Sequence, residues 1–220
     1  MSVGSYHKQS ASSGLISLRV DPQDVKGLQA FAQLVPKAAQ AAQRRAINRT
    51  LRWLSTRIAR EVGRAERIAI TAVRKRLKAY PMSSDGRGRL WFGVNPIEAS
   101  RAGRPRTTRS GVSVAGRRYQ GAFYKRVYGG SPDIWIRTAS KHFDASDYPD
   151  SEVSRRAGPS SGWISENDSR FPLAKAKISL DDVRLHFETW TNQAHDRLLR
   201  ELEHELNYQL QKYLRRTGNG

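Results

Sequence analysis

The side chains in this sequence that could do chemistry are above all arginines, and the densest group lies in RRAINRTLRWLSTRIAREVGR, residues 44–64. At 3.6 residues per turn, three arginines fall on one side of a helix: Arg45, Arg49 and Arg52. A guanidinium group binds carboxylates and phosphates through paired hydrogen bonds. We therefore expect these three residues, the helix arginines, to face an acidic partner or a nucleic acid.

A second basic group lies in SRAGRPRTTRSG, residues 100–111, which has no large apolar side chain. It contains the four loop arginines: Arg101, Arg104, Arg106 and Arg109. AGRPR is close to the Arg-Gly-Arg-Pro core that lies in AT-rich minor grooves, but Ala102 replaces the first arginine. We expect an exposed, mobile loop whose arginines neutralise phosphates without reading base sequence.

Patterns typical of catalysis or metal binding are missing from the sequence. The chain has no cysteine, and none of its five histidines stands at a metal-ligand spacing. GVSVAG, residues 111–116, resembles a nucleophile elbow only in outline, because Ala115 stands where that motif requires glycine. We predict no enzymatic activity, no cofactor and no metal. A nuclease that uses His142 is the alternative in this class.

Acidic and aromatic side chains have simpler explanations. Five acids fall on the polar side of the C-terminal helix, where carboxylates normally meet water: Asp181, Asp182, Glu201, Glu203 and Glu205. Three aromatic residues on expected strands could stack on bases: Trp91, Phe92 and Trp135. Aromatic residues on strands are more often part of a core, and we expect that role here.

Positive charge is concentrated in one part of the chain. The 220 residues carry a net charge of +19, and residues 36–126 hold 23 Lys/Arg against four acids. This imbalance favours a polyanionic or acidic partner over a solvated surface. The first 14 residues are polar and lack the apolar core typical of a secretory signal, and no apolar run in the sequence approaches membrane-spanning length. We expect no membrane partner, and synthesis in a cytoplasm.

The elements that must position these side chains follow from periodicity and from turn residues. Residues 1–14 predict a flexible arm and 15–20 a strand. Asp21 as N-cap and Pro22 at the first helical position predict a helix from 22 to about 63, with a break at Pro36. A further helix is predicted at 66–79. Strands are expected at 90–97 and 112–114, a hairpin at 121–139, and a long irregular loop at 144–170. An apolar stripe from Val183 to Tyr213 predicts a long C-terminal helix.

The fold class that follows is α+β, with a long N-terminal helix, a small antiparallel sheet with extended loops, and a long C-terminal helix. We expect residues 15–220 to form a single domain. Seven apolar residues are predicted to pack the helices together: Ile47, Leu51, Leu54, Phe187, Trp190, Leu202 and Leu206. Part of the C-terminal stripe could also serve a neighbouring subunit.

Four segments in order resemble the minor tail protein Z family of long-tailed bacteriophages and prophages: AAQRRAINRTLRWLSTRIAREVG, VRKRLKAY, RRYQGAF and FPLAKAKISL. The similarity runs from about residue 25 to 215. Ala46, Asn48 and Arg49 carry it most clearly, together with residues 121–123 and 171–173.

The resemblance implies a structural virion protein that completes the head-proximal end of the tail and supports head–tail joining. It implies a ring of six subunits around the DNA axis, assembled in the host bacterial cytoplasm. The implied partners are further copies of the chain, the tail terminator or tail tube proteins, a head-side connector or stopper protein, and genomic DNA without sequence preference. The alternative is a free basic nucleic-acid-binding protein without catalytic activity.

Overall fold

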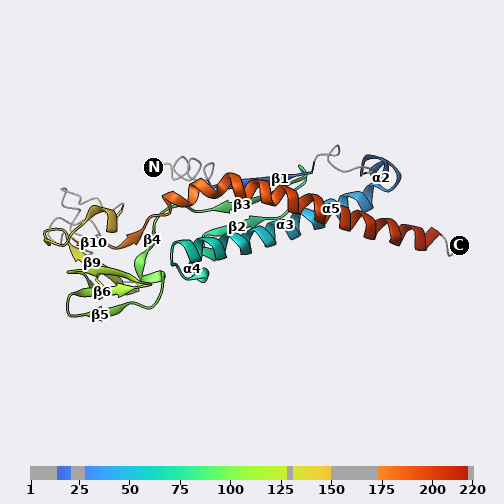
Figure 1. Cartoon of the computed structure of the whole chain (residues 1–220). Coiled ribbons are helices and arrows are strands. Elements are labelled where there is room, and N and C mark those ends of the chain that lie inside the picture. The colour runs from blue at the N-terminus through green and yellow to red at the C-terminus, as the bar shows by residue number, and fades with distance from the viewer. Residues whose placement is uncertain (1–13, 21–27, 128–130, 150–172, 218–220) are drawn as a thin grey trace, which may run out of the picture. The chain divides into compact units, whose positions relative to one another are not determined.

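The fold described here is that of a computed structural model, for residues 14–20, 28–127, 131–149 and 173–217. It confirms the α+β class with a long N-terminal helix, small antiparallel sheets and a long C-terminal helix (Figure 1). The chain forms two compact units. Unit 1 comprises Met1–Glu61, Arg74–Gly93 and Val183–Gly220, and unit 2 comprises Val62–Val73 and Val94–Asp182. The prediction of a single domain stays a prediction, because a compact unit need not fold independently.

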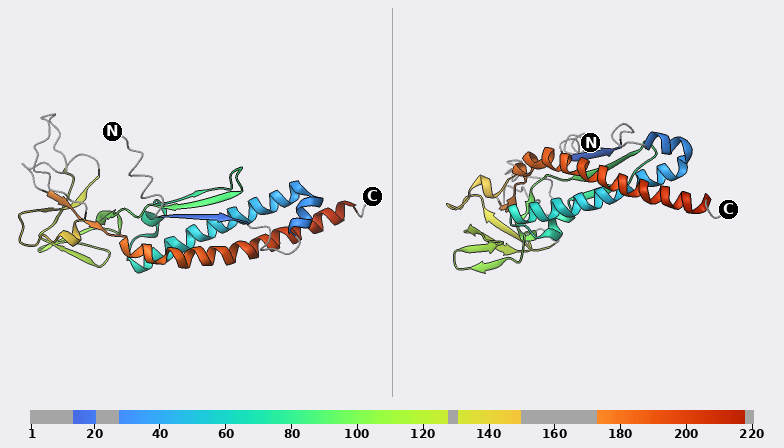
Figure 2. Two further views of the ribbon diagram at one scale, coloured as in Figure 1. Left: turned by 90° about the horizontal axis from the view of Figure 1, so that it is seen from above. Right: turned by 45° about the vertical axis from the view of Figure 1, so that its right-hand side comes forward.

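Unit 1 combines the long helices with one sheet. Its helical segments are α2 (Leu28–Leu34), most of α3 (Pro36–Ala65), α5 (Phe187–Thr217) and the end of the 3-10 turn η3 (Asp181–His186). Its antiparallel strands, in the order β1-β3-β2, are β1 (Leu15–Arg19), β3 (Arg87–Phe92) and β2 (Leu77–Tyr80). Both views in Figure 2 show α3 and α5 side by side.

The core of unit 1 lies where the apolar stripe of α3 meets α5 and one face of the sheet. Ile47 and Leu54 are fully buried, as is Leu202 on α5. Gly88 on β3 lies so close to α3 that a Cβ there would overlap the Ile47 side chain and come within 2.9 Å of Leu51 Cδ1. The missing side chain at Gly88 therefore allows the sheet to approach the helix.

The predicted helix over 66–79 is wrong at both ends. Helix α4 covers only Ile70–Arg74, and the chain then continues as β2, which pairs with β3 in the register Lys78↔Trp91. Tyr80 precedes Pro81, and a residue before proline is disfavoured in helical conformation. Strand β3 also offers backbone hydrogen bonds to residues 77–80. This pairing makes the segment a strand, although its apolar spacing is compatible with a helix.

The described residues of unit 2 form three small antiparallel sheets. The first, in the order β5-β6-β7, consists of β5 (Arg106–Thr108), β6 (Gly111–Val114) and β7 (Arg117–Gln120). The second, in the order β10-β9-β8, consists of β8 (Phe123–Lys125), β9 (Asp133–Arg137) and β10 (Leu173–Lys175). The third pairs β4 (Ile97–Glu98) with β11 (Lys177–Ile178). Strands β8 and β9 form the predicted hairpin, in the register Phe123↔Trp135.

Two segments expected to be irregular are partly ordered. The basic segment 100–111 is not a free loop, because Arg106–Thr108 pairs with Gly111–Val114 as β5 and β6. The segment 144–170 begins with the 3-10 turn η2 (Ala145–Asp147), where the Asp144 carboxylate accepts a hydrogen bond from Ser146 N at 2.9 Å. The predictions for residues 1–13, for the helix start at 21–27 and for residues 150–170 lie outside the described residues.

None of the helices in the described part of the chain has the length and apolar content that a bilayer crossing requires.

Candidate functional site: two groups of arginines

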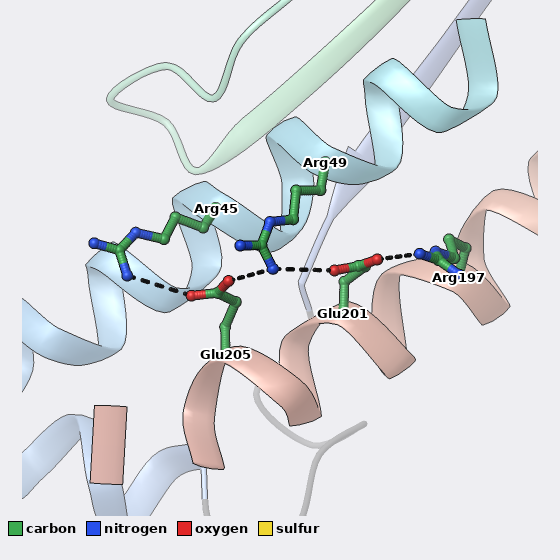
Figure 3. Close-up of polar contacts among 5 residues, drawn as sticks. All are labelled: Arg45, Arg49, Arg197, Glu201 and Glu205. Carbon is green, nitrogen blue, oxygen red and sulfur yellow. Dashed lines mark hydrogen bonds and ion pairs between the residues drawn. The ribbon is translucent and has the colours of Figure 1, made fainter. Parts of the chain in front are cut away.

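The helix arginines meet carboxylates of α5, as Figure 3 shows. Arg49 Nη1 lies 2.5 Å from Glu205 Oε1 and 3.5 Å from Glu201 Oε2, and Arg45 Nη1 lies 3.4 Å from Glu205 Oε2. Arg197 on α5 also pairs with Glu201. Arg45 precedes Arg49 on α3, whereas the carboxylate nearest Arg45, Glu205, follows Glu201 on α5. The two helices are therefore antiparallel, and the ion pairs form a ladder between them.

The carboxylates of this ladder are buried, although the sequence analysis expected them to face water. The Glu205 side chain is 3% exposed and the Glu201 side chain 11%, whereas Arg49 is 49% exposed. Gln209 continues the buried polar row one helical turn further. Burial removes water from the carboxylates, so they depend on the guanidinium groups for compensation. Part of the expected acidic partner of α3 is therefore the chain's own C-terminal helix.

Arg52 differs from its two neighbours on α3. Its side chain is exposed, and no ion pair of Arg52 is found among the described residues. Further along α3, Arg57 pairs with Glu61 at 2.9 Å, and Glu61 accepts a hydrogen bond from Trp190 Nε1 at 2.6 Å. Arg45 and Arg49 therefore form ion pairs with α5, whereas the Arg52 side chain is exposed.

An open pocket of about 420 Å³ lies beside the ladder. Arg49, Arg197, Arg200, Glu201 and His204 line it. Because Arg49 pairs with Glu205 and Arg197 with Glu201, Arg200 is the one arginine of this pocket without an ion pair among the described residues.

The seven predicted packing residues are not equally buried. Five lie in the core with exposures of 0–2%: Ile47, Leu51, Leu54, Trp190 and Leu202. Phe187 is half-buried and stacks on Phe92, with ring centroids 6.1 Å apart. Leu206 is also half-buried, and exposure rises beyond it to 43% at Leu210. The apolar stripe of α5 therefore leaves the core before the helix ends.

The four loop arginines lie in unit 2. Arg101 ends the 3-10 turn η1 (Ala99–Arg101), and its Nε lies 3.1 Å from Glu98 Oε2. Arg106 lies on β5, and Arg109 lies in the turn between β5 and β6. Arg104, Arg106 and Arg109 are exposed, and none of them forms an ion pair with another described residue. Three of the four guanidinium groups are therefore available to a partner.

The glycine-rich segment that resembles a nucleophile elbow is a hairpin turn. Val114 and Arg117 close the β6–β7 pair, and the two residues between them have positive φ, 50° at Ala115 and 81° at Gly116. Positive φ at both central residues is typical of the type I′ turn that joins adjacent antiparallel strands. The described residues also contain no group of three or more His, Asp or Glu side chains that could hold a metal. His142 is an exposed residue of unit 2.

Two buried tyrosines in unit 2 have perturbed acidity. Burial raises the pKa of Tyr119 from 10.0 to about 12, and burial together with the nearby Asp147 carboxylate raises the pKa of Tyr148 further. Their rings meet edge to face at a centroid distance of 6.2 Å. This arrangement is a packing contact that becomes unfavourable when either phenol ionises.

The aromatic residues on strands occupy two environments. Phe92 and Trp135 are buried in the cores of their units, as expected. Trp91 is half-buried on the opposite face of β3 and lines a groove together with Tyr80. Sequence reasoning missed this groove because it assigned residues 77–80 to a helix. Alternation along LKAY was the signal that could have revealed a strand.

Comparison of the chain with protein-family models, with curated proteins and with solved structures gave no match.

Proposed function

We propose that this chain is a structural bacteriophage minor tail protein that completes the head-proximal end of the tail and supports head–tail joining. In this proposal it acts as one subunit of a ring of six around the DNA axis. Its partners are neighbouring copies, the tail terminator or tail tube proteins, and a head-side connector or stopper. The proposal rests on the sequence resemblance and on surfaces that suit assembly.

The observation that carries the proposal is the exposed apolar end of α5. Leu210 is 43% exposed and Tyr208 is 52% exposed, on the helix whose earlier part forms the core of unit 1. Leu34 of α2, in the same unit, is 78% exposed. Removing apolar side chains of this size from water lowers the free energy, so contact with a neighbouring subunit would be favourable. A subunit that packs into a ring has a use for them.

The distribution of charge supports the same proposal. Arg45 and Arg49 are engaged by Glu205 and Glu201, so they stabilise the subunit itself. The charge left for partners includes Arg52 and the three exposed loop arginines. In a closed ring these charges repeat around the axis, where acidic neighbours or DNA would reduce their mutual repulsion.

The experiment combines one apolar substitution with a matched control on the same turn of α5. Leu210→Glu places a carboxylate on the exposed apolar surface, and Gln211→Glu adds the same charge at an exposed neighbouring position. In a phage that carries this gene, we expect Leu210→Glu to yield separate heads and tails. We expect Gln211→Glu to yield joined virions, counted by electron microscopy. Joined, infectious virions after complete deletion of the gene would refute the proposal.

The second candidate function is that of a free nucleic-acid-binding protein, and the exposed loop arginines favour it. It predicts that isolated protein binds duplex DNA and that binding weakens steeply with salt. Replacing Arg104, Arg106 and Arg109 by alanine should then abolish binding, while Arg101→Ala, which removes a residue paired with Glu98, should have less effect. Normal tails and normal head joining in the triple variant would show that tail completion does not need these three arginines, which separates DNA binding from the first candidate function.

A further inference from the structure

Among the described residues, the sheet of unit 1 buries one of its two faces. Side chains alternate along a strand, and Ile16, Leu18, Leu90 and Phe92 point inward with exposures of 1–4%. The residues between them point to the other face, where a groove of about 660 Å³ lies over all three strands. No described helix or loop fills this groove.

The strand register brings aromatic and cationic side chains together in that groove. Trp91 stands between Leu15 on β1 and Lys78 on β2, and in the next outward row Arg89 stands opposite Tyr80. Directly opposed residues in an antiparallel pair have Cβ atoms about 5 Å apart, and diagonal neighbours such as Trp91 and Tyr80 about 7–8 Å apart. Trp91 and Tyr80 therefore lie on neighbouring strands and line the same groove.

The charge around the rings is mainly positive. Three cations are exposed on this face: Lys78, Arg87 and Arg89. On β1, Arg19 lies directly opposite Arg87. Lys78 Nζ lies 5.2 Å from the centre of the Tyr80 ring. One carboxylate pairs with these cations: Asp85 Oδ2 lies 3.0 Å from Arg89 Nη2. One acid among four cations leaves the groove attractive to an anion.

The indole of Trp91 is positioned by a glycine. A Cβ built at Gly93 would lie 3.0 Å from Trp91 Cη2 and 3.4 Å from Cζ2. The ring therefore lies against the main chain at residue 93, which restricts its movement. A restricted ring loses little conformational entropy when a flat group stacks on it.

We propose that the outer face of the β1-β3-β2 sheet binds single-stranded nucleic acid. Trp91 and Tyr80 stack on bases, and Lys78, Arg87 and Arg89 contact phosphates. Proteins that bind single-stranded nucleic acid commonly combine aromatic rings with cations, because every unpaired base offers a flat face for stacking and every nucleotide a phosphate. Duplex DNA keeps its bases stacked and offers only its phosphates. An apolar peptide would leave the cations without a partner.

This inference uses residues different from those that support the proposed function, so either can fail alone. The test measures binding of the full chain to a fluorescent oligothymidylate of about 12 nucleotides, a length within the range of single-strand sites. We expect Trp91→Leu and Tyr80→Leu each to weaken binding by roughly 5-fold to 100-fold, since stacking contributes on that scale. Tyr80 is 43% exposed, so its replacement tests the idea even if Trp91→Leu fails to fold.

Cation substitutions provide a second readout. Removing one cation that binds a phosphate should reduce the slope of log Kd against log salt by about 0.7 for a single strand. We expect this change for Lys78→Gln and Arg89→Gln. The matched control is Lys37→Gln, which removes one exposed cation from α3, away from the sheet face. The control should leave the affinity within about 2-fold, because it touches no phosphate in this site.

Three results would overturn the inference. The first is unchanged affinity in both aromatic variants. The second is a duplex of the same length binding as tightly as the single strand to a variant in which the loop arginines Arg104, Arg106 and Arg109 are replaced by alanine. The third is polyglutamate of equal charge displacing the oligonucleotide equally well, which would assign the groove to acidic polypeptides. The chain has five tryptophans, so Trp91→Phe identifies which of them responds to the ligand. If oligothymidylate quenches the fluorescence of the wild type and quenches Trp91→Phe less, the inference is supported.

Discussion

Replacing Arg49 by methionine tests whether the ion-pair ladder stabilises unit 1. Methionine keeps most of the aliphatic volume and removes the charge. The change deprives Glu205 of its closest described partner, at 2.5 Å, and leaves Arg45 at 3.4 Å. Glu201 keeps Arg197. The variant therefore asks how much a 3% exposed carboxylate depends on one guanidinium.

The magnitude lies between two limits. Breaking a fully buried ion pair costs about 3–5 kcal/mol, and an exposed pair contributes about 0.2–1 kcal/mol. Here the carboxylate is buried but the guanidinium is 49% exposed, and a second arginine remains. We expect Arg49→Met to lower the free energy of unfolding by about 1.5–3 kcal/mol. Arg52→Met is the matched control, on the same helix without a described ion pair, and should cost about 0.5 kcal/mol or less.

The assay is guanidinium denaturation followed by circular dichroism at 222 nm, which reports mainly on α3 and α5. The double variant Arg49→Met with Glu205→Gln isolates the pairwise contribution, and we expect a coupling free energy of about 1–2 kcal/mol. The reasoning fails if Arg49→Met destabilises no more than Arg52→Met. It also fails if the coupling is close to zero, because the ladder would then contribute nothing measurable.

Three further predictions concern packing, turn geometry and pH. Gly88→Ala should destabilise the chain by about 1–3 kcal/mol, because its Cβ would overlap Ile47; thermal unfolding measures this, and an unchanged melting temperature would contradict it. Ala115→Asn should stabilise by about 0.5–1 kcal/mol, because asparagine tolerates the φ of 50° at that position; chemical denaturation against Ala115→Val, which should destabilise, provides the comparison. Since burial raises the pKa of Tyr119 to about 12, its contribution to stability is present below pH 10 and is lost as pH rises through about 12. Tyrosinate absorbance compared between wild type and Tyr119→Phe should show one late-titrating phenol missing from the variant.

The sequence was sufficient for the long helices and for one hairpin. The 3.6-residue spacing of Ile47, Leu51 and Leu54 predicted α3, and an equivalent stripe predicted α5. Gly129–Pro132 between two β-rich runs predicted the hairpin of β8 and β9. These features are local, because a helix or a hairpin is specified largely by residues a few positions apart.

Local reasoning failed where a distant segment changed the outcome. Residues 77–80 have apolar spacing compatible with a helix, but pairing with β3 makes them a strand. The segment 100–111 looked like a free loop, but β6 supplies a partner for Arg106–Thr108. Hydrogen-bonding partners that lie elsewhere in the chain leave no mark in the composition of the segment itself.

The sequence by itself determined that α3 has an apolar side and an arginine side, and that its charge requires compensation. Only the tertiary structure decided what supplies part of that compensation, because Glu201 and Glu205 are more than 130 residues away in the chain and reach Arg45 and Arg49 only when α5 packs antiparallel to α3. The same holds for the groove around Trp91, which exists because three separate strands pair in one register. Periodicity fixes which side chains share a face, whereas folding fixes what that face meets.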